Sequence, residues 1–408
     1  MELIKIAWRN IWRNKTRSMV VILSVTFGML GGGFSTAVML GGIDRRVDKA
    51  INNESAHFQV HQDDYLENPE PGLFMSNVQP LIDNISQKGF VSGVSNRLLV
   101  NAMMQSPHNT SGATVNGITP AQEKQVSTLH KNLVEGTYFD ADKKNQVVIS
   151  KSTAEKLKLN VRSKMVLTFQ DKEGNLTGGA FRVAGIFKTS NKAFDEMNVF
   201  VLRQDLESLT GFSENTSHEI AVLFKDNDDL KERTAELVKI TPEKLDARNW
   251  KELNPALGMM SMMTEKYLSY LVAIILFALA FGIINTMLMA ILERKKELAM
   301  LKAIGMNEGK IRIMIVWETL FLTAIGSVAG LLFNQALVVW LSKTGINLAA
   351  FSEGMESFGF SSVIYPSING VFYLQIVALV VITALIASIF PIMRASKMKP
   401  AEILSSNY

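Results

Sequence analysis

The sequence contains no cysteine among its 408 residues. Disulfide bonds, thiol catalysis and cysteine-based zinc or iron–sulfur sites are therefore excluded. The sequence also lacks a G-x-x-x-x-G-K-[ST] loop, a G-x-S-x-G turn and an H-E-x-x-H helix. Since no combination of acid, base and nucleophile is visible, we expect no catalytic residue and no enzymatic activity in this chain.

Histidine is also scarce, with five residues in all. His57 and His61 could share one face of a strand, but a metal site needs more ligands than these two. We therefore expect no bound metal, and we interpret both residues as histidines on the surface of a strand.

Four long windows of the sequence contain almost no charged residues. They are Ser18–Ile43, Tyr267–Leu292, Ile313–Ser342 and Ser357–Met393, and the one charge among them is Glu318 in the third window. A membrane-spanning helix needs about 20 mostly apolar residues. The sequence therefore predicts four transmembrane helices and excludes a soluble protein.

The charges outside these windows are distributed unevenly. The segments 1–17, 293–312 and 394–408 together hold 14 basic and five acidic residues, whereas 44–266 holds 27 basic and 30 acidic ones. By the positive-inside rule, both termini and the basic loop 293–312 are predicted to be cytoplasmic. The pI near 9.0 then reflects topology, and we expect no nucleic-acid partner.

These features predict an α-helical membrane protein with one helix before, and three helices after, a large mixed α+β extracytoplasmic domain. The expected segments are an amphipathic helix at 1–17, spans at 18–43, 267–292, 313–342 and 371–393, an outer domain at 44–266, a cytoplasmic coupling helix at 293–312, an outer loop at 343–370 and a cytoplasmic tail at 394–408.

The segment 44–266 alternates between short strand-like and helix-like patterns. The expected strands are 57–61, 146–149, 181–187, 199–202 and 219–224. The expected helices are 79–88, 152–159, 203–209 and 228–240, and Asp171–Asn175 is expected to form a hairpin turn.

Residues 3–16 place basic and apolar side chains on separate stripes at helical spacing, with Ile11 on the apolar one. Trp8 and Trp12 suit the headgroup level of a bilayer, and Arg9 and Arg13 suit anionic lipid. We interpret this segment as an interfacial anchor; a solvated basic leader is the alternative.

The basic loop 293–312 contains a second short amphipathic pattern. Leu298, Leu301 and Ile304 recur at i, i+3 and i+6 beside Met300, Gly305 suits the C′ position, and Asn307 suits the N-cap of the next helix. Because a loop has no core in which to bury this stripe, the pattern indicates a partner groove. A helix lying along the inner leaflet is the alternative.

The run ERKKELAMLKAIGM resembles the coupling segment of the FtsX/MacB-type ABC transporter permeases. Other segments resemble that family in the same order along the chain. They are Ala7–Ser18, Val115–Pro120, Leu133–Gly136, Val147–Leu159, Phe181–Phe187, Glu318–Gly330 and Pro391–Leu404. The layout of one span, a large outer domain and three spans is most similar to the lipoprotein-releasing (Lol-type) branch.

The resemblance implies a permease subunit in a bacterial inner membrane, with its large domain in the periplasm. The implied partners are a cytoplasmic ABC ATPase dimer that carries ATP and Mg, a second permease subunit (the same or a paralogue) and membrane lipids; this chain would hold no cofactor. The implied ATPase-coupling residues are Glu293, Arg294, Glu297, Leu298, Met300, Leu301, Lys302, Ile304 and Gly305.

The implied activity is extraction of lipoproteins or similar amphiphiles from the outer leaflet and transfer to a periplasmic carrier or adaptor. Mechanotransmission to an efflux partner, as in MacB, and regulation of cell-wall enzymes, as in FtsX, are the alternatives. In the Lol branch a longer hairpin that contains proline marks the carrier-recruiting subunit, whereas Gln170–Gly179 is short and lacks proline.

Several apolar residues near the outer ends of the first two spans are candidates for a substrate path, because flexible methionine side chains suit variable acyl chains. Packing against the outer domain or the outer leaflet is the alternative. The candidates are Phe34, Val38, Leu40, Met259, Met260, Met262 and Met263. Glu318 has two interpretations: it forms an interfacial hydrogen bond that shifts with the state of the ATPase, or its carboxylate only packs between helices.

Overall fold

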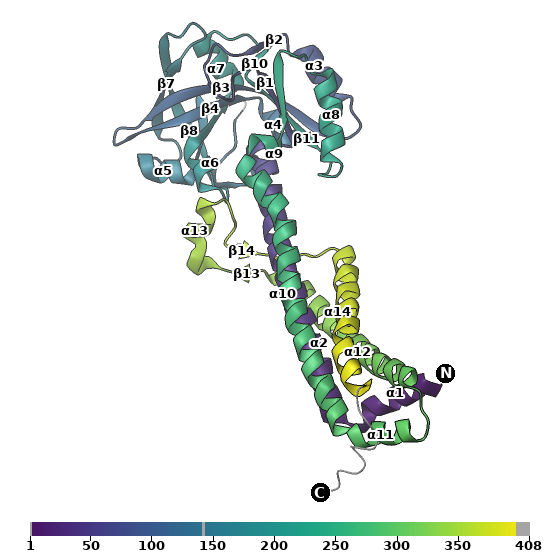
Figure 1. Ribbon diagram of the computed structural model, residues 1–408. Coiled ribbons are helices and arrows are strands. Elements are labelled where there is room, and N and C mark those ends of the chain that lie inside the picture. The colour runs from purple at the N-terminus through teal and green to yellow at the C-terminus, as the bar shows by residue number, and fades with distance from the viewer. Residues whose placement is uncertain (1, 141–142, 397–408) are drawn as a thin grey trace. The chain divides into compact units, whose positions relative to one another are not determined.

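The computed structural model describes residues 2–140 and 143–396 (Figure 1). The chain divides into two compact units, each taken by itself below. The helical unit comprises residues 1–43, 262–347 and 363–408, and the α+β unit comprises residues 44–261 and 348–362. The segment 348–362 thus belongs with the α+β unit, although it is separated from the rest of that unit in sequence.

Four helices are long and apolar enough to cross a membrane. They are α2 (Lys15–Ala50), α10 (Pro255–Glu293), α12 (Glu308–Thr344) and α14 (Gly370–Ser396). The shorter elements here are α1 (Glu2–Arg13), α11 (Lys295–Ala303) and a two-stranded ribbon, β13 (Ile346–Asn347) with β14 (Val363–Ile364). The prediction of four long apolar helices, one before and three after a mixed segment, is confirmed.

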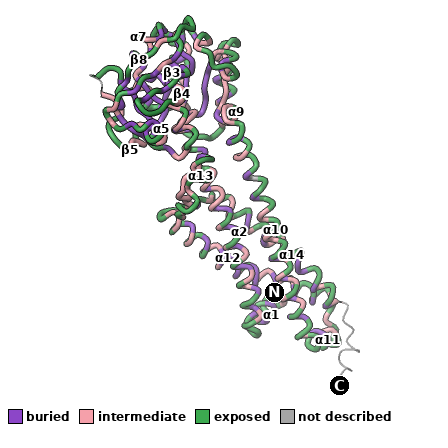
Figure 2. The backbone as a smooth tube through the Cα atoms, turned by 90° about the vertical axis from the view of Figure 1, so that its left-hand side faces the viewer, coloured by how far each residue is buried: buried purple, intermediate pink, exposed green. Residues whose placement is uncertain are grey.

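Small residues allow α12 to approach α2 closely. A Cβ atom added at Gly326 would lie 2.7 Å from Cβ of Val25, and the Thr26 hydroxyl donates to the Gly326 carbonyl at 3.2 Å. Such contacts replace the hydrophobic driving force, which is absent between helices in lipid. The outer surfaces of the long helices are exposed (Figure 2), and α10 buries 17% of its most apolar window. Lipid or another chain must therefore cover α10.

The α+β unit is built on a ten-stranded mixed sheet with the order β12-β1-β11-β3-β4-β9-β6-β8-β5, and β7 pairs with both β3 and β8. The strands are β1 (Phe58–Gln62), β3 (Val91–Gln105), β4 (Thr110–Ile118), β5 (Leu133–Gly136), β6 (Gln146–Ser150), β7 (Lys164–Gln170), β8 (Leu176–Phe187), β9 (Asn198–Leu202), β11 (Glu219–Phe224) and β12 (Leu245–Asn249). A separate pair joins β2 (Met75–Ser76) to β10 (Thr216–Ser217).

Short helices flank this sheet. They are α3 (Gln79–Ser86), α4 (Pro120–Val126), α5 (Lys151–Leu157), α6 (Lys192–Met197), α7 (Arg203–Thr210), α8 (Leu230–Ile240), α9 (Trp250–Leu253) and α13 (Ser352–Ser357), with a π-helical turn at Ile51–Ser55 and 3₁₀ turns at Leu129–Lys131 and Ala349–Phe351. Burial within this unit is concentrated in the strands (Figure 2).

The long strand β3 connects two apolar cores. Its first half contributes Val94 to a core with β1, β11, α3 and α8, and its second half contributes Leu98 to a core with β4 and β6–β9. Arg97 lies between these two residues and is buried. Its guanidinium contacts Glu123 at 2.7 Å and Glu219 at 2.5 Å, which satisfies the charge in place of water.

The five expected strands and four expected helices are present, with ends that differ by a few residues. The Asp171–Asn175 turn is confirmed as the β7–β8 connection, in which the Asp171 carboxylate accepts from the amides of Glu173 and Asn175 at 2.9 Å. The prediction of surface histidines is wrong. His57 Nδ1 accepts from the Phe224 amide at 3.1 Å, and His61 is enclosed beside Glu219, so both rings are buried.

Candidate functional site

The short helix α11 is the best-defined feature of the basic loop. The amide of Met306 donates to the Leu301 carbonyl and that of Gly305 donates to Lys302, while Gly305 has a φ of 94°. This pattern is a Schellman motif, in which glycine supplies the left-handed residue. Asn307 then caps α12 by accepting from the Gly309 amide at 3.1 Å. The predicted roles of Gly305 and Asn307 are confirmed.

The apolar side chains of this segment divide between the core and the solvent. Leu298 is 7% exposed and packs in the helical core, and Leu301 is half-buried. Met300 and Ile304 are 54% and 77% exposed. The expectation of one unburied stripe is therefore wrong for Leu298, because the surrounding helices provide a core for it. The exposed apolar surface for a partner is centred on Met300 and Ile304.

The start of α11 is tied to other helices by charge. Arg294 Nη1 contacts Oε1 of Glu318 on α12 at 3.0 Å, and its Nε contacts Glu297 at 3.2 Å. Arg13 of α1 pairs with the same Glu297 carboxylate, and its guanidinium lowers the pKa of Glu297 below the ordinary value. Glu293, just before α11, lies 3.8 Å from Arg17 of α2. One network thus connects α1, α11 and α12, and a separate pair joins the end of α10 to α2.

The end of α11 is held in a similar way. Lys302 Nζ contacts Glu308 of α12 at 2.7 Å and donates to the carbonyl of Ser396 in α14 at 3.0 Å. Arg312 contacts Glu308 at 3.3 Å and the Ser396 hydroxyl at 2.9 Å. Sequence reasoning missed this second set of contacts, although the i, i+4 spacing of Glu308 and Arg312 was a signal for it.

The closing motif that ends at Leu404 is described only in part. Pro391 lies inside α14, whereas the residues from Lys397 onward are outside the described residues.

The N-terminal helix α1 packs on the protein with one side only. Ile11 is buried, and Trp8 contacts Phe321 of α12 edge to face at 5.3 Å. Helix α12 covers the side of α1 that contains Ile11. Trp12, Arg9 and Arg13 are exposed, and Trp8 is partly exposed at 42%. The exposed residues keep the mixture of aromatic and basic groups typical of an interfacial anchor.

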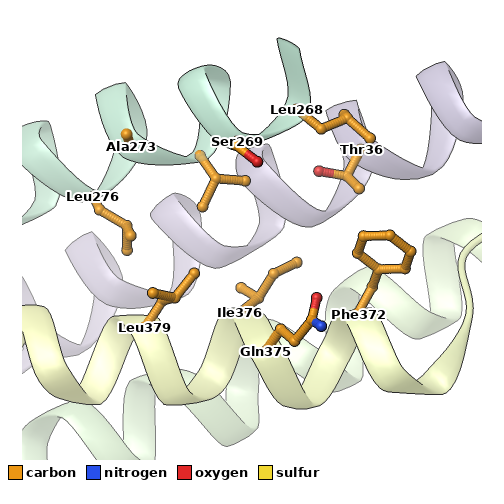
Figure 3. A pocket seen from close by; sticks show the side chains of 10 residues that line it. Thr36, Leu268, Ser269, Ala273, Leu276, Phe372, Gln375, Ile376 and Leu379 are labelled. Carbon is orange, nitrogen blue, oxygen red and sulfur yellow. The ribbon is translucent and has the colours of Figure 1, made fainter. Parts of the chain in front are cut away.

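A cavity of about 590 Å³ lies between α2, α10 and α14 (Figure 3). The polar side chains of Thr36, Ser269 and Gln375 lie towards one end, and Leu276 and Leu379 lie towards the other. Leu268 and Phe372 lie at the same end as Thr36, so the lining is mainly apolar with three polar side chains among it.

The substrate-path residues predicted from sequence lie on the same helices as this cavity but do not line it. Phe34, Val38 and Leu40 of α2 and Met260 of α10 are half-buried, whereas Met259, Met262 and Met263 are exposed. Their role stays a prediction. The α14 contribution was missed, although Gln375 is an amide inside an uncharged apolar window and polar groups there commonly mark functional sites.

Comparison with known proteins gives two family matches that follow one another along the chain. The family description "MacB-like periplasmic core domain" matches residues 18–240, and "FtsX-like permease C-terminal" matches residues 269–400. The first match alone covers more than half of the chain.

Curated relatives and solved structures are similar to the chain as well. The lipoprotein-releasing system transmembrane protein LolE of Haemophilus influenzae is 21% identical over 98% of this chain and 99% of its own length. The corresponding LolC protein of Neisseria meningitidis is 22% identical over 96% and 95%. The extracellular domain of the transporter YknZ from Gram-positive bacteria matches 47% of this chain and 99% of its own at 18% identity, with a TM-score of 0.34.

The order of the two family matches agrees with a large domain that follows the first apolar helix and with three apolar helices after it. The chain therefore belongs to the FtsX/MacB-type ABC transporter permeases.

Proposed function

We propose that this permease couples ATP hydrolysis by a separate ATPase to the extraction of lipid-anchored proteins, or similar amphiphiles, from the outer leaflet of a bacterial inner membrane. Similarity to LolE and LolC over nearly their full lengths supports this substrate class. The observation that carries the proposal is the pair of exposed apolar residues, Met300 and Ile304, on a charged loop that is held by ion pairs to the long helices.

In this proposal Met300 and Ile304 dock into a groove of the ATPase, and both termini lie on the same cytoplasmic side. A displacement of α11 is passed to α12 through Arg294 and Glu318 and to α14 through Lys302. Ion pairs are strong only at close contact. Helices that such pairs join therefore move together as long as the pairs stay intact. A second permease subunit, the same chain or a paralogue, would complete the transporter.

The substrate would enter between the helices as a lipid anchor. Moving an acyl chain out of a bilayer costs about 0.8 kcal/mol per CH₂ group exposed to water, so the path must offer apolar surface. The cavity between α2, α10 and α14 offers such surface at Leu276 and Leu379 and at Leu268 and Phe372. Its mainly apolar lining suits an acyl chain.

The docking step is tested by co-purification. The double variant Met300→Glu/Ile304→Glu should lose the co-purifying ATPase, because two charges would have to be buried in an apolar groove. Met300→Leu/Ile304→Leu keeps the apolar surface and serves as the matched control. Equal capture of the ATPase by both variants would contradict docking through these residues.

The extraction step is tested by filling the cavity. Ala273→Trp places a large ring among the lining residues, whereas Ile274→Trp places the same ring at a neighbouring residue that does not line the cavity. We expect only the first variant to stop the release of a triacylated lipoprotein from proteoliposomes while ATP hydrolysis continues. Release that is unaffected by Ala273→Trp would argue for mechanotransmission or regulation of cell-wall enzymes.

The partners are tested by mass spectrometry of the complex purified gently from its own membranes. An ATPase together with a triacylated lipoprotein would support extraction, and the same spectrum would distinguish one permease chain from two. An ATPase with a periplasmic adaptor or a cell-wall hydrolase, and no lipoprotein, would contradict it.

A further inference from the structure

The α+β unit contains a second cavity that the proposed function does not use. It has a volume of about 700 Å³ and is lined by described residues from three parts of the chain, at 136–140 and 143–146, at 161–162 and at 182–184. Cavities of this size commonly hold small molecules. Both the cavity and all of its lining belong to one unit, so its geometry is fixed by that unit alone.

Backbone hydrogen bonds bring these three segments together. The Arg182 amide donates to the Asn145 carbonyl at 2.8 Å, and the Arg162 amide donates to the Val183 carbonyl at 2.8 Å. The Val183 amide in turn donates to Ser163 at 3.0 Å. Two of the cationic residues, Arg162 and Arg182, make these bonds themselves, and Lys144 is next to Asn145. All three line the same cavity.

The charge of the lining is strongly unbalanced. Among the described lining residues the cations are Lys143, Lys144, Arg162 and Arg182, and the one carboxylate is Asp140. Asp140 is already paired with Lys143 at 2.6 Å. Lys144, Arg162 and Arg182 have no ion pair or side-chain hydrogen bond within the described part of the chain. Among the described residues, Arg162 and Arg182 thus have no counter-charge in contact, whereas Lys144 lies in the field of Asp205, whose carboxylate accepts from the neighbouring Asn145 amide at 2.7 Å.

The sheet adds a further positive charge beside this group. Lys164 on β7 lies directly opposite Arg182 on β8, and both side chains are exposed on the same face. Like charges directly opposite each other destabilise an antiparallel pair. An anion bound between these side chains would remove that repulsion.

A buried side chain holds the backbone of two residues in this lining. Gln146 is 4% exposed, donates to the carbonyls of Asp140 and Lys143 at 2.6 Å, and accepts from the Asp140 amide at 3.0 Å. Gln146, at the start of β6, thereby holds the backbone of Asp140 and Lys143 beside it. Restraint of residues that line a cavity lowers the cost of binding.

Arg162 adopts an unfavourable backbone conformation at this position. Its φ is 71°, in the left-handed region that suits glycine. Strain of this kind persists where the surrounding structure enforces it, and it is concentrated at functional sites. Here the strained residue brings a guanidinium to the cavity.

We propose that this cavity binds a phosphate group through Arg162, Arg182 and Lys144. A phosphate dianion matches the excess of positive charge better than a single carboxylate does, and two guanidinium groups can each donate a pair of hydrogen bonds to its oxygens. The phosphate belongs either to a small soluble molecule or to the headgroup of an anionic lipid; the recognition chemistry is the same in both cases.

The test uses the full-length protein. In neutral detergent, inorganic pyrophosphate is titrated by calorimetry; in lipid nanodiscs, hydrogen exchange at residues 143–146 and 160–163 is compared between phosphatidylglycerol and phosphatidylcholine. Saturable pyrophosphate binding that weakens with added salt identifies a soluble phosphate. Protection in phosphatidylglycerol without pyrophosphate binding identifies a headgroup. If neither is observed, the proposal is wrong.

Two double variants distinguish binding at this cavity from a general effect of positive charge on the protein. Arg162→Gln/Arg182→Gln should weaken the observed binding at least about tenfold, since the guanidinium pairs are lost. Lys231→Gln/Lys239→Gln removes the same charge from exposed positions on α8 and should leave binding unchanged. Equal weakening by both double variants would overturn the proposal.

A single variant distinguishes a loss of anion binding from a loss of folded protein. Arg162→Gly removes the guanidinium and also relieves the left-handed backbone strain. It should lose anion binding while its thermal midpoint is no lower than that of the parent protein. Full retention of binding by Arg162→Gly would overturn the role assigned to the guanidinium.

Discussion

In the α+β unit, the buried guanidinium of Arg97 contacts two carboxylates, and one of them, Glu123, also accepts from the Ser95 hydroxyl at 2.9 Å. In the helical unit, the buried oxygens of Thr323, Ser327 and Asn334 on α12 have no hydrogen-bond partner within the described part of the chain. In the first arrangement each of the three guanidinium nitrogens donates to a carboxylate, which fixes one geometry. The second leaves capacity unused along a helix interface.

This contrast teaches how one chain can combine a rigid part with a movable one. A fully paired buried cluster is lost only at high cost, because each partner left behind remains charged in the interior. A helix interface of small residues with unused hydroxyl groups can change partners without leaving a charge unpaired. We therefore expect the Arg97 cluster to resist deformation and the α2–α12 interface to accommodate motion.

The largest expected effect comes from breaking the Arg97 cluster. Arg97→Met leaves Glu123 and Glu219 buried without their cation, and should lower the unfolding free energy of the α+β unit by about 3–5 kcal/mol. Urea-dependent hydrogen exchange in β3 and β11 measures this change. Arg248 makes a partly exposed pair with Glu67, so Arg248→Met should cost less than about 1 kcal/mol. Similar costs for the two variants would contradict the contrast.

The next effect concerns close approach in the helical unit. Gly326→Ala would place a Cβ 2.9 Å from the Ile22 carbonyl oxygen, and overpacking of this kind costs about 1–3 kcal/mol. Gly31 faces open space, so Gly31→Ala should be neutral or gain up to about 1 kcal/mol from helix propensity. Thermal unfolding in detergent compares the two variants. A destabilising Gly31→Ala would show that α2 is sensitive to any added methyl group.

Acid should weaken the α+β unit through its buried histidines. Burial lowers the pKa of His57 to about 4 and that of His218 to about 4, so the unfolded chain binds more protons than the folded one between about pH 4 and 6.5. Stability is therefore fully present above pH 6.5 and falls as the pH drops through this range, by about 1.4 kcal/mol per pH unit for each histidine.

Asp195 opposes this trend. Burial raises its pKa to about 6, so the folded chain binds more protons there between about pH 3.8 and 6. Two histidines against one carboxylate leave a net loss of about 1.4 kcal/mol per pH unit on acidification. Urea midpoints across this pH range measure the slope, and His57→Asn should reduce it, since the amide oxygen can still accept from Phe224. A slope unchanged in His57→Asn would contradict this assignment.

Much of this architecture could be predicted from sequence, because apolar windows without charge have few alternatives to long helices. The recognised strands 146–149, 199–202 and 219–224 carry continuous apolar runs, and 57–61 alternates polar and apolar residues. The central strands β3 and β4 were missed, since runs such as Val91–Asn96 mix glycine, serine and asparagine with few apolar side chains. Their pairing is decided by tertiary packing, which local propensity does not encode.

The candidate site was predicted only in part for a similar reason. Helix signals that act within a few residues, such as the Gly305 cap, were visible locally. The Arg294–Glu318 pair and the contribution of α14 to the cavity join residues that are distant in sequence, so no local pattern indicates which partners meet. Burial of His57 and His61 depended on the strand that covers them and was equally hidden.

The smallest expected effect tests whether Glu318 serves packing or transmission. Glu318→Gln keeps the shape and one hydrogen bond to Arg294 but removes the charge, so assembly should survive with a stability change of about 1 kcal/mol. If the pair transmits motion, ATP hydrolysis by the complex should become uncoupled from substrate release, because a neutral bond is about half as strong. Glu236→Gln, which removes the charge from an exposed pair with Lys88 in the α+β unit, is the matched control and should preserve coupling. Unchanged hydrolysis and release in Glu318→Gln would assign this carboxylate to packing alone.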